Sequence, residues 1–225
     1  MRKLLIVLVV LVLVAVVGDR VAAKLVSDQA ENRLRTEGLT DPSVDVGGFP
    51  FLTQVLSRTF DEVTLTTPSL ERDGVRAQAI RATATDVDVP RNGDVVLGEV
   101  DARGTITYDE VLRQAGQDDL ELSRASADEV RLRREVTVLG QTLAVSARGR
   151  VEADGRRIRV VPRGFELQGG EAVSPPLAAS LTDRFSLTYD VRGLPKGVRL
   201  DRIRPTDTGF QVSLSGQDVR LDGTL

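Results

Sequence analysis

Apolar and polar residues alternate strictly along residues 142–153 of this chain. The apolar positions are Leu143, Val145, Ala147, Val151 and Ala153. Such alternation is typical of an antiparallel sheet that buries one face and exposes the other to water. The pattern recurs along residues 129–138, 185–191 and 210–215. Short helices are expected at Tyr108–Gln114 and Pro175–Asp183. The sequence therefore predicts a β-rich fold of the α+β class, with Arg134 as an exception on an otherwise apolar face.

The N-terminus carries an export signal or a membrane anchor. Met1-Arg2-Lys3 precedes an unbroken apolar run from Leu4 to Val17. Positive charge before a short apolar run is typical of a secretory signal, and it places the following chain on the outer side of the membrane. Val21-Ala22-Ala23 offers a cleavage site, so residues 4–17 either anchor the protein or are removed. We expect an anchor or signal at 1–18, and an exported protein on the periplasmic side of the cytoplasmic membrane.

A long amphipathic helix is expected directly after this run, over residues 19–37. Val21, Leu25 and Leu34 follow the three- and four-residue spacing of one helical face. This helix is the only long one available to cover the sheet. We therefore expect a strongly curved antiparallel sheet wrapped around it, in a single domain over residues 19–225. The interior is either tightly filled by side chains or open as an apolar groove, and the sequence is consistent with both.

The composition excludes several classes of function. The chain has no Cys and no His, so it lacks disulfides, zinc–thiolate sites and the commonest general base. Its net charge of -3 does not fit a nucleic-acid-binding protein. Asp118, Asp119 and Glu121 are acidic, but their position between a helix and a strand is that of a solvated loop. We expect no catalytic residues, no metal and no cofactor.

Two stretches of the chain resemble a known family. They are Gly48-Phe49-Pro50-Phe51-Leu52-Thr53-Gln54-Val55-Leu56, followed by Phe60–Leu65, and Gly193–Leu200, followed by the strand at 209–215. With the N-terminal run and helix, they resemble the LmeA-like phospholipid-binding family of actinobacteria, which is associated with lipomannan elongation. The resemblance implies a tubular lipid-binding type of fold and binding of phospholipids, including phosphatidylinositol types. It implies no catalytic motif.

The candidate binding residues follow from these patterns. The predicted lipid groove is lined by Val21, Leu25, Leu34, Phe49, Phe51, Leu52, Phe185, Leu187 and Tyr189. The predicted contacts to headgroups or membrane are Lys196, Arg199, Arg202 and Arg204. Pro50 holds Phe49 and Phe51 apart, so this loop either dips into a membrane or plugs the core.

A second basic group lies on the outward face of the predicted sheet. It comprises Arg148, Arg150, Arg156, Arg157 and Arg159. These side chains either meet anionic headgroups or form a solvated face paired with Glu152 and Asp154.

Three hypotheses of function remain open from the sequence. The first is a phospholipid-binding envelope protein that holds acyl chains and supports lipoglycan synthesis or lipid transfer. The second is an adaptor with a filled core that scaffolds envelope glycosyltransferases. An enzyme based on carboxylates is the third, and the outward position of nearly all acids disfavours it.

Overall fold

The computed structural model describes residues 2–72, 74–91, 94–138, 140–191 and 194–221, with side chains from residue 15 onward except at 72, 138 and 141. Gly193, in the second stretch of the resemblance, lies outside these residues, as do the side chains of residues 4–14 within the expected anchor at 4–17. The helices are α1 (Arg2–Thr36), α2 (Phe51–Ser57), α3 (Tyr108–Ala115) and α4 (Pro175–Phe185). The strands are β1 (Leu39–Thr40), β2 (Ser43–Val46), β3 (Thr59–Arg72), β4 (Val75–Asp88), β5 (Val95–Thr107), β6 (Leu120–Arg124), β7 (Glu129–Val138), β8 (Gln141–Asp154), β9 (Arg157–Leu167), β10 (Leu187–Asp190), β11 (Val198–Pro205) and β12 (Gly209–Leu221).

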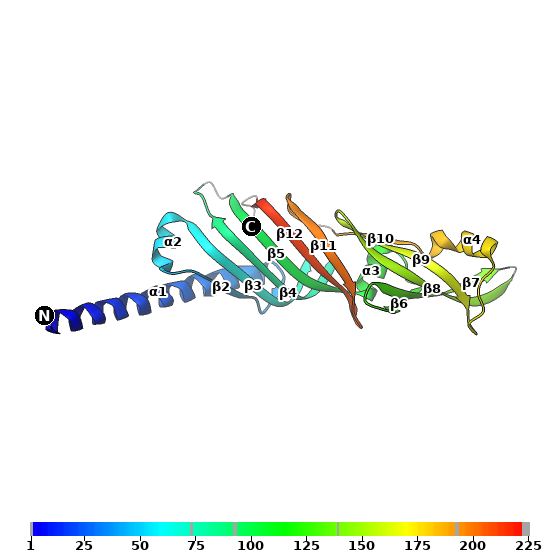
Figure 1. Cartoon of the computed structure of the whole chain (residues 1–225), viewed down its shortest axis with the longest axis horizontal. Helices are drawn as coiled ribbons and strands as arrows, with labels where there is room; N and C mark the ends of the chain where they lie inside the picture. Colours follow the sequence, from blue (N-terminus) through cyan, green and yellow to red (C-terminus); the bar gives the residue numbers. More distant parts are fainter. Residues whose placement is uncertain (1, 73, 92–93, 139, 192–193, 222–225) are drawn as a thin grey trace.

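Two antiparallel sheets lie one after the other along an elongated molecule (Figure 1). The first sheet has the order β1-β3-β4-β5-β12-β11, with β2 also paired to β3, and it curls into a half-barrel. The second has the order β10-β9-β8-β7-β6. The β-rich α+β class predicted from the alternation is therefore confirmed, but the chain divides its strands between two sheets.

The second sheet has a closed core. Its apolar face, which includes Val130, Leu132 and Val145, is covered by α3 and α4, and these three side chains are fully buried. Phe185 from α4 and Phe165 from β9 meet edge to face, with ring centroids 5.3 Å apart. The predicted strand at 185–191 is wrong at its start, because Phe185 is the last residue of α4 and the strand begins at Leu187.

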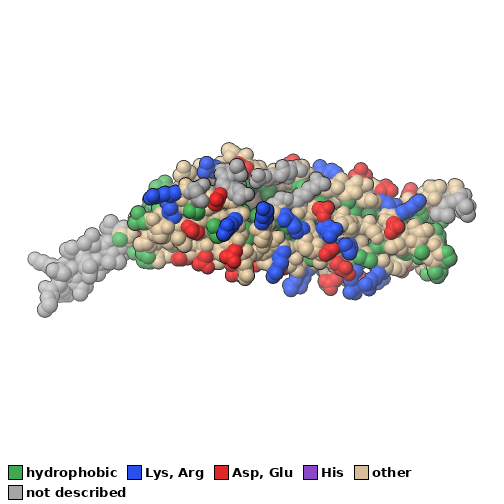
Figure 2. All heavy atoms as spheres, turned by 90° about the horizontal axis from the view of Figure 1, so that it is seen from above, with side chains coloured by type: hydrophobic (Ala, Val, Ile, Leu, Met, Phe, Trp, Pro, Cys, Tyr) green, Lys and Arg blue, Asp and Glu red, His purple; other side chains and the backbone are tan. Residues whose placement is uncertain are grey.

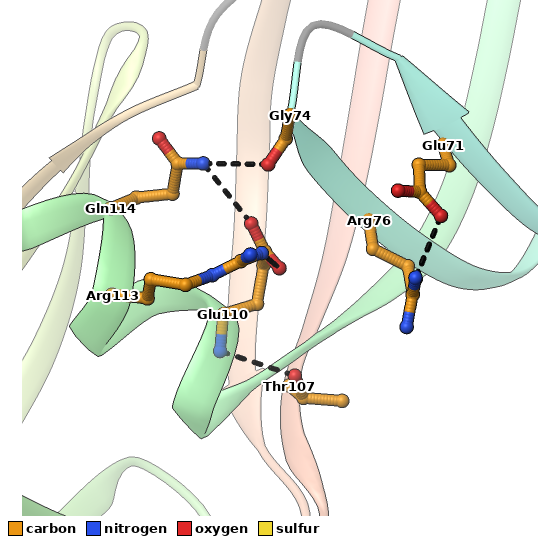
Figure 3. A network of polar contacts seen from close by, with 7 residues as sticks. All are labelled: Glu71, Gly74, Arg76, Thr107, Glu110, Arg113 and Gln114. Atoms are coloured by element: carbon orange, nitrogen blue, oxygen red, sulfur yellow. Dashed lines mark hydrogen bonds and ion pairs between the residues drawn. The ribbon is translucent and has the colours of Figure 1, made fainter.

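Helix α3 joins the two sheets. Thr107 caps its first turn by accepting a hydrogen bond from the backbone N–H of Glu110 at 3.3 Å. The buried Glu110 carboxylate bonds to Arg113 and Gln114, and Gln114 also donates to the carbonyl of Gly74, 2.8 Å away in the β3–β4 turn (Figure 3). This network ties α3 to a hairpin of the first sheet.

Helix α1 packs on the first sheet with an unexpected face. Its buried positions are Asp19, Ala23 and Ser27, four residues apart, and they face β2 and α2. Of the aliphatic face that the sequence predicts to cover the sheet, Val21 and Leu25 are exposed, and Leu34 is half-buried. The helix packs along β1, β2 and α2, at one edge of the sheet, so a sheet wrapped around this helix is not shown. Among the residues with described side chains, no helix combines the length and the hydropathy that crossing a bilayer requires.

Candidate functional site

The exposed large hydrophobic side chains of the described residues all lie at one end of the molecule. They are Val17, Val21, Leu25, Val26, Phe49, Leu52, Val55 and Leu56, with exposed fractions from 39% to 84%. We call these eight residues the apolar tip. They come from α1, from α2 and from the loop before α2, and the two helices are in contact. The tip lies at the end of the first sheet where α1 projects, and hydrophobic side chains are visible at this end in Figure 2.

The loop before α2 and α2 itself contain both buried residues, which face the sheet, and exposed residues, which face outward. Phe51 is buried, and its ring centroid lies 6.2 Å from that of Phe60. Gln54 is also buried, donating to the carbonyl of Gly47 at 3.2 Å and accepting from the backbone N–H of Asp61 at 2.9 Å. These two residues fix α2 on the sheet, so Leu52 faces outward. The buried Phe51 fits the hypothesis that the Phe-Pro-Phe loop plugs the core. The exposed Phe49 fits the hypothesis that the loop enters a membrane.

Short and acidic side chains hold α1 on the protein. The Asp19 carboxylate accepts a hydrogen bond from the backbone N–H of Leu52 at 2.8 Å, in the first turn of α2. Glu31 accepts from the backbone N–H of Val44 at 2.9 Å, in β2. An apolar cluster of Ala23, Val46 and Phe51 also connects α1 with β2 and α2. The helix therefore binds the sheet through polar bonds and small residues, while its aliphatic residues Val17, Val21, Leu25 and Val26 stay exposed.

Beyond α1, the same face of the first sheet continues as a half-buried apolar surface. The register places Leu65, Ala82, Ala102 and Leu214 opposite one another across β3, β4, β5 and β12. Ala84 and Val100 form the next row. All six side chains are of intermediate exposure, whereas the core of the second sheet is buried. We call these six residues the sheet surface.

Basic residues accompany the tip. Arg20 is exposed, and its guanidinium carbon lies 5.7 Å from the ring centroid of Phe49. Lys24 is exposed on the next turn of α1, and Arg58 ends α2 in a left-handed conformation. Aliphatic and cationic side chains thus share one end of the molecule, which is the composition that binds an anionic membrane surface.

The predicted headgroup residues lie elsewhere. Lys196 precedes β11, and Arg199, Arg202 and Arg204 are exposed on this edge strand, across the sheet from β1. Arg199 lies 3.1 Å from Asp201. A hydrogen bond with Ser215 holds the pKa of Asp201 below its ordinary value, and the hydrogen bond and positive charge of Arg199 lower this pKa further. The structure does not bring these four residues to the apolar tip, and their headgroup role stays a prediction.

The predicted groove residues divide into three groups. Val21, Leu25, Phe49 and Leu52 meet in the apolar tip, with Phe51 buried beneath them. Leu34 is half-buried near the end of α1. Phe185, Leu187 and Tyr189 lie in the closed core that includes the second sheet. The sequence reasoning missed Val55 and Leu56 as site residues, although their spacing from Leu52 is that of one helical face.

The fold and this geometry define a β-rich protein that exposes an apolar, cation-flanked end and an adjacent apolar sheet surface, as a lipid-binding protein does. The family model described as LmeA-like phospholipid-binding matches residues 17–215, and the chain belongs to this family. The predicted family is confirmed, and it is a lipid-binding family rather than a known enzyme family. None of the curated proteins matches the chain.

Proposed function

We propose that this protein binds phospholipid at a membrane surface, with the apolar tip among the acyl chains. The outward aliphatic face of α1 carries this proposal. A helix that packs through Asp19, Ala23 and Ser27 while exposing Val21 and Leu25 is inverted relative to an ordinary surface helix. Such an inversion is stable in water only at a cost, and contact with lipid removes that cost.

The energetics support a membrane-docking role. Burial of one Val, Leu or Phe side chain contributes about 1.5 to 3 kcal/mol relative to exposure. Several tip residues together therefore give reversible binding, and the nearby cations Arg20 and Lys24 add about 1 kcal/mol each at an anionic surface. These charges favour anionic phospholipids, of which phosphatidylinositol types are the expected example.

The sheet surface is the proposed place for an extracted acyl chain. It adjoins the tip across β3, and each methylene buried on it contributes about 0.8 kcal/mol. An acyl chain lying there would cover the part of the apolar sheet face that α1 leaves exposed. The small residues Ala82, Ala84 and Ala102 leave room above the strands for such a chain.

The family and the N-terminal apolar run support a proposal for the biological setting. We propose that residues 4–17 direct export and that the protein acts on the periplasmic side of the cytoplasmic membrane. There it would carry phospholipid, or present it to an envelope glycosyltransferase, in support of lipomannan-type lipoglycan synthesis.

Native mass spectrometry of the full chain released from mild detergent tests the proposal. We expect copurified phospholipid, enriched in anionic classes over the membrane of the expression host. Flotation with vesicles of phosphatidylcholine and phosphatidylinositol should also recover the protein. A chain without lipid that also stays away from both vesicle types would overturn the proposal and favour the adaptor hypothesis.

A further inference from the structure

Three arginines lie side by side on the outer face of the second sheet. Arg131 of β7 is directly opposite Arg148 of β8, and Arg148 is directly opposite Arg163 of β9. Residues directly opposite in antiparallel strands have their Cβ atoms about 5 Å apart, and like charges there are destabilising. We call these three residues the arginine row. All three are exposed.

The arginine row has no acidic partner within ion-pair distance in the described part of the chain. Glu121, Glu129 and Glu166 lie on the same face, but none forms an ion pair with the row. Neighbouring arginines behave differently: Arg157 and Arg159 both contact Asp154, at 3.7 and 3.0 Å. Of the basic stripe predicted from the sequence, Arg157 and Arg159 are therefore paired with Asp154, whereas Arg148 belongs to the unpaired arginine row.

Two residues of the arginine row, Arg131 and Arg148, line a concavity together with Arg133. A hollow of about 440 Å³ is bounded by Arg131, Arg133, Arg148, Gly164, Glu166 and Gln168. The register shift after Ala147 and the left-handed Gly164, with φ 62°, break the ladder beside Arg148. Gly169 and Gly170 form the turn that walls one side. Arg131, Arg133 and Arg148 thus line a space large enough for a small organic anion.

We propose that this hollow is a binding site for a phosphate ester. Guanidinium groups bind phosphate through paired N–H donors, and three of them supply more than enough donors and positive charge for the non-bridging oxygens of one phosphate group. Glu166 and Gln168 supply acceptors at the rim for hydroxyl groups of the alcohol that carries the phosphate. The bound anion would also relieve the repulsion within the arginine row.

The site is separate from the apolar tip and does not depend on the proposed lipid function. The second sheet lies at the end of the molecule away from the start of α1 (Figure 1). The phosphate ester therefore belongs either to a lipid headgroup or to a soluble phosphorylated sugar or polyol, and the same guanidinium chemistry recognises both.

Calorimetric titration of the full chain in neutral detergent tests the site, with inorganic phosphate and glycerophosphoinositol as probes. We expect Arg148→Gln to weaken both affinities about tenfold or more, because it removes the central guanidinium. Arg159→Gln, on the same face but paired with Asp154, is the matched control and should bind as the wild type does. Unchanged phosphate affinity in Arg148→Gln, or an equal loss in Arg159→Gln, would overturn the proposal.

A stability measurement adds an independent arm. Without phosphate at low ionic strength, Arg148→Gln should raise the thermal midpoint, since it breaks the run of like charges, and added phosphate should stabilise the wild type alone. Equal shifts from phosphate and from sodium chloride at matched ionic strength, in both proteins, would contradict the site.

Flotation with phosphatidylinositol vesicles then distinguishes the two sources of the phosphate ester. Loss of vesicle binding in Arg148→Gln assigns the site to a lipid headgroup, and retained vesicle binding assigns it to a soluble ester.

Discussion

Arg134 lies on the buried face of the second sheet, and its guanidinium group is 2.7 Å from the carboxylate of Asp119. The Arg134 side chain is 9% exposed, whereas that of Asp119 is 70% exposed. Gln117 and the carbonyl of Arg184 accept its other hydrogen bonds, and its guanidinium carbon lies 6.0 Å from the ring centroid of Phe185. The acidic loop at 117–119 therefore neutralises a buried cation, which explains both the loop and the exception on the apolar face.

Removal of Asp119 should leave this cation without its counter-charge. We expect Asp119→Ala to lower the free energy of unfolding by about 1 to 3 kcal/mol, as for a buried group that loses a charged partner. The double variant with Arg134→Met should recover most of this loss, because it removes the buried charge. Asp118→Ala is the control: its carboxylate is exposed and forms no ion pair among the described residues, so a change within about 0.5 kcal/mol is expected. Equal losses at both positions in denaturant unfolding would contradict this account.

A charge placed in the apolar tip should weaken membrane binding without unfolding the protein. Leu25 and Leu56 are 65% and 84% exposed, so the folded state tolerates Asp at either position. Each substitution should reduce the partition onto phosphatidylinositol vesicles by about ten- to a hundredfold, the loss of one buried aliphatic side chain. Gln211→Asp adds the same charge on an exposed site of β12 and should bind vesicles as the wild type does. Equal vesicle binding by all four proteins would show that the tip does not enter the membrane.

The bond between Asp19 and the backbone of Leu52 should position α2 within the tip. Asp19→Ala leaves the N–H of Leu52 without its acceptor, and we expect a loss of about 1 kcal/mol in the free energy of unfolding. Asp19→Asn keeps an acceptor oxygen and should retain most of the stability. Hydrogen exchange of residues 51–57 should rise in Asp19→Ala ahead of the rest of the chain. Unchanged exchange there would mean that Phe51 and Gln54 alone hold α2.

Much of the fold was predictable because its signals are local. Alternation located the central strands near β7, β8 and β12, and the helical spacing located α1, because each pattern depends only on which side of an element faces water. The start of β10 was missed because Phe185 fits both the end of a helix and the first inward position of a strand. The left-handed residues Ala79, Asp86 and Asp218, with φ from 49° to 50°, carry no signal that a single sequence reveals.

The orientation of α1 could not be predicted from hydropathy. The three- and four-residue spacing identifies an aliphatic face on α1, and in an ordinary surface helix such a face packs against the core. Here Asp19 and Glu31 find backbone donors on α2 and β2, and these long-range hydrogen bonds decide the orientation. The division of the strands into two sheets is likewise a property of long-range pairing. For the same reason the predicted groove residues lie away from the tip: Phe185 ends α4, Leu187 and Tyr189 lie in β10, and all three belong to the buried core.

Filling the sheet surface should displace acyl chains. Ala102 lies between Ala82 and Leu214 on the half-buried face, so Phe at this position would occupy the space above the strands. We expect the amount of copurified phospholipid to fall severalfold, with stability within about 1.5 kcal/mol of the wild type. Thr83→Phe lies on the opposite face of β4 and is the matched control. If Ala102→Phe keeps its full lipid content, the acyl chain binds elsewhere.

Tyr108 should make the protein sensitive to alkali. Its hydroxyl donates to the carbonyl of Thr206 at 2.6 Å, and burial raises its pKa from 10.0 to about 12, with Arg124 opposing and Asp207 reinforcing the shift. The folded state therefore holds this proton more tightly than the unfolded chain does. Its contribution to stability is complete below pH 10.0 and is lost as pH rises toward about 12. The free energy of unfolding should fall in that window by up to about 1.4 kcal/mol per pH unit.

Tyr108→Phe isolates this effect. At neutral pH the variant should lose about 0.5 to 1.5 kcal/mol for the missing hydrogen bond to Thr206. Above pH 10.0 its free energy of unfolding should fall less steeply than that of the wild type, so that the two curves converge. Urea unfolding at a series of pH values measures both slopes, and tyrosinate absorbance of the folded wild type measures the ionisation directly. Parallel curves for the two proteins would mean that Tyr108 ionises in the folded state as readily as in the unfolded chain.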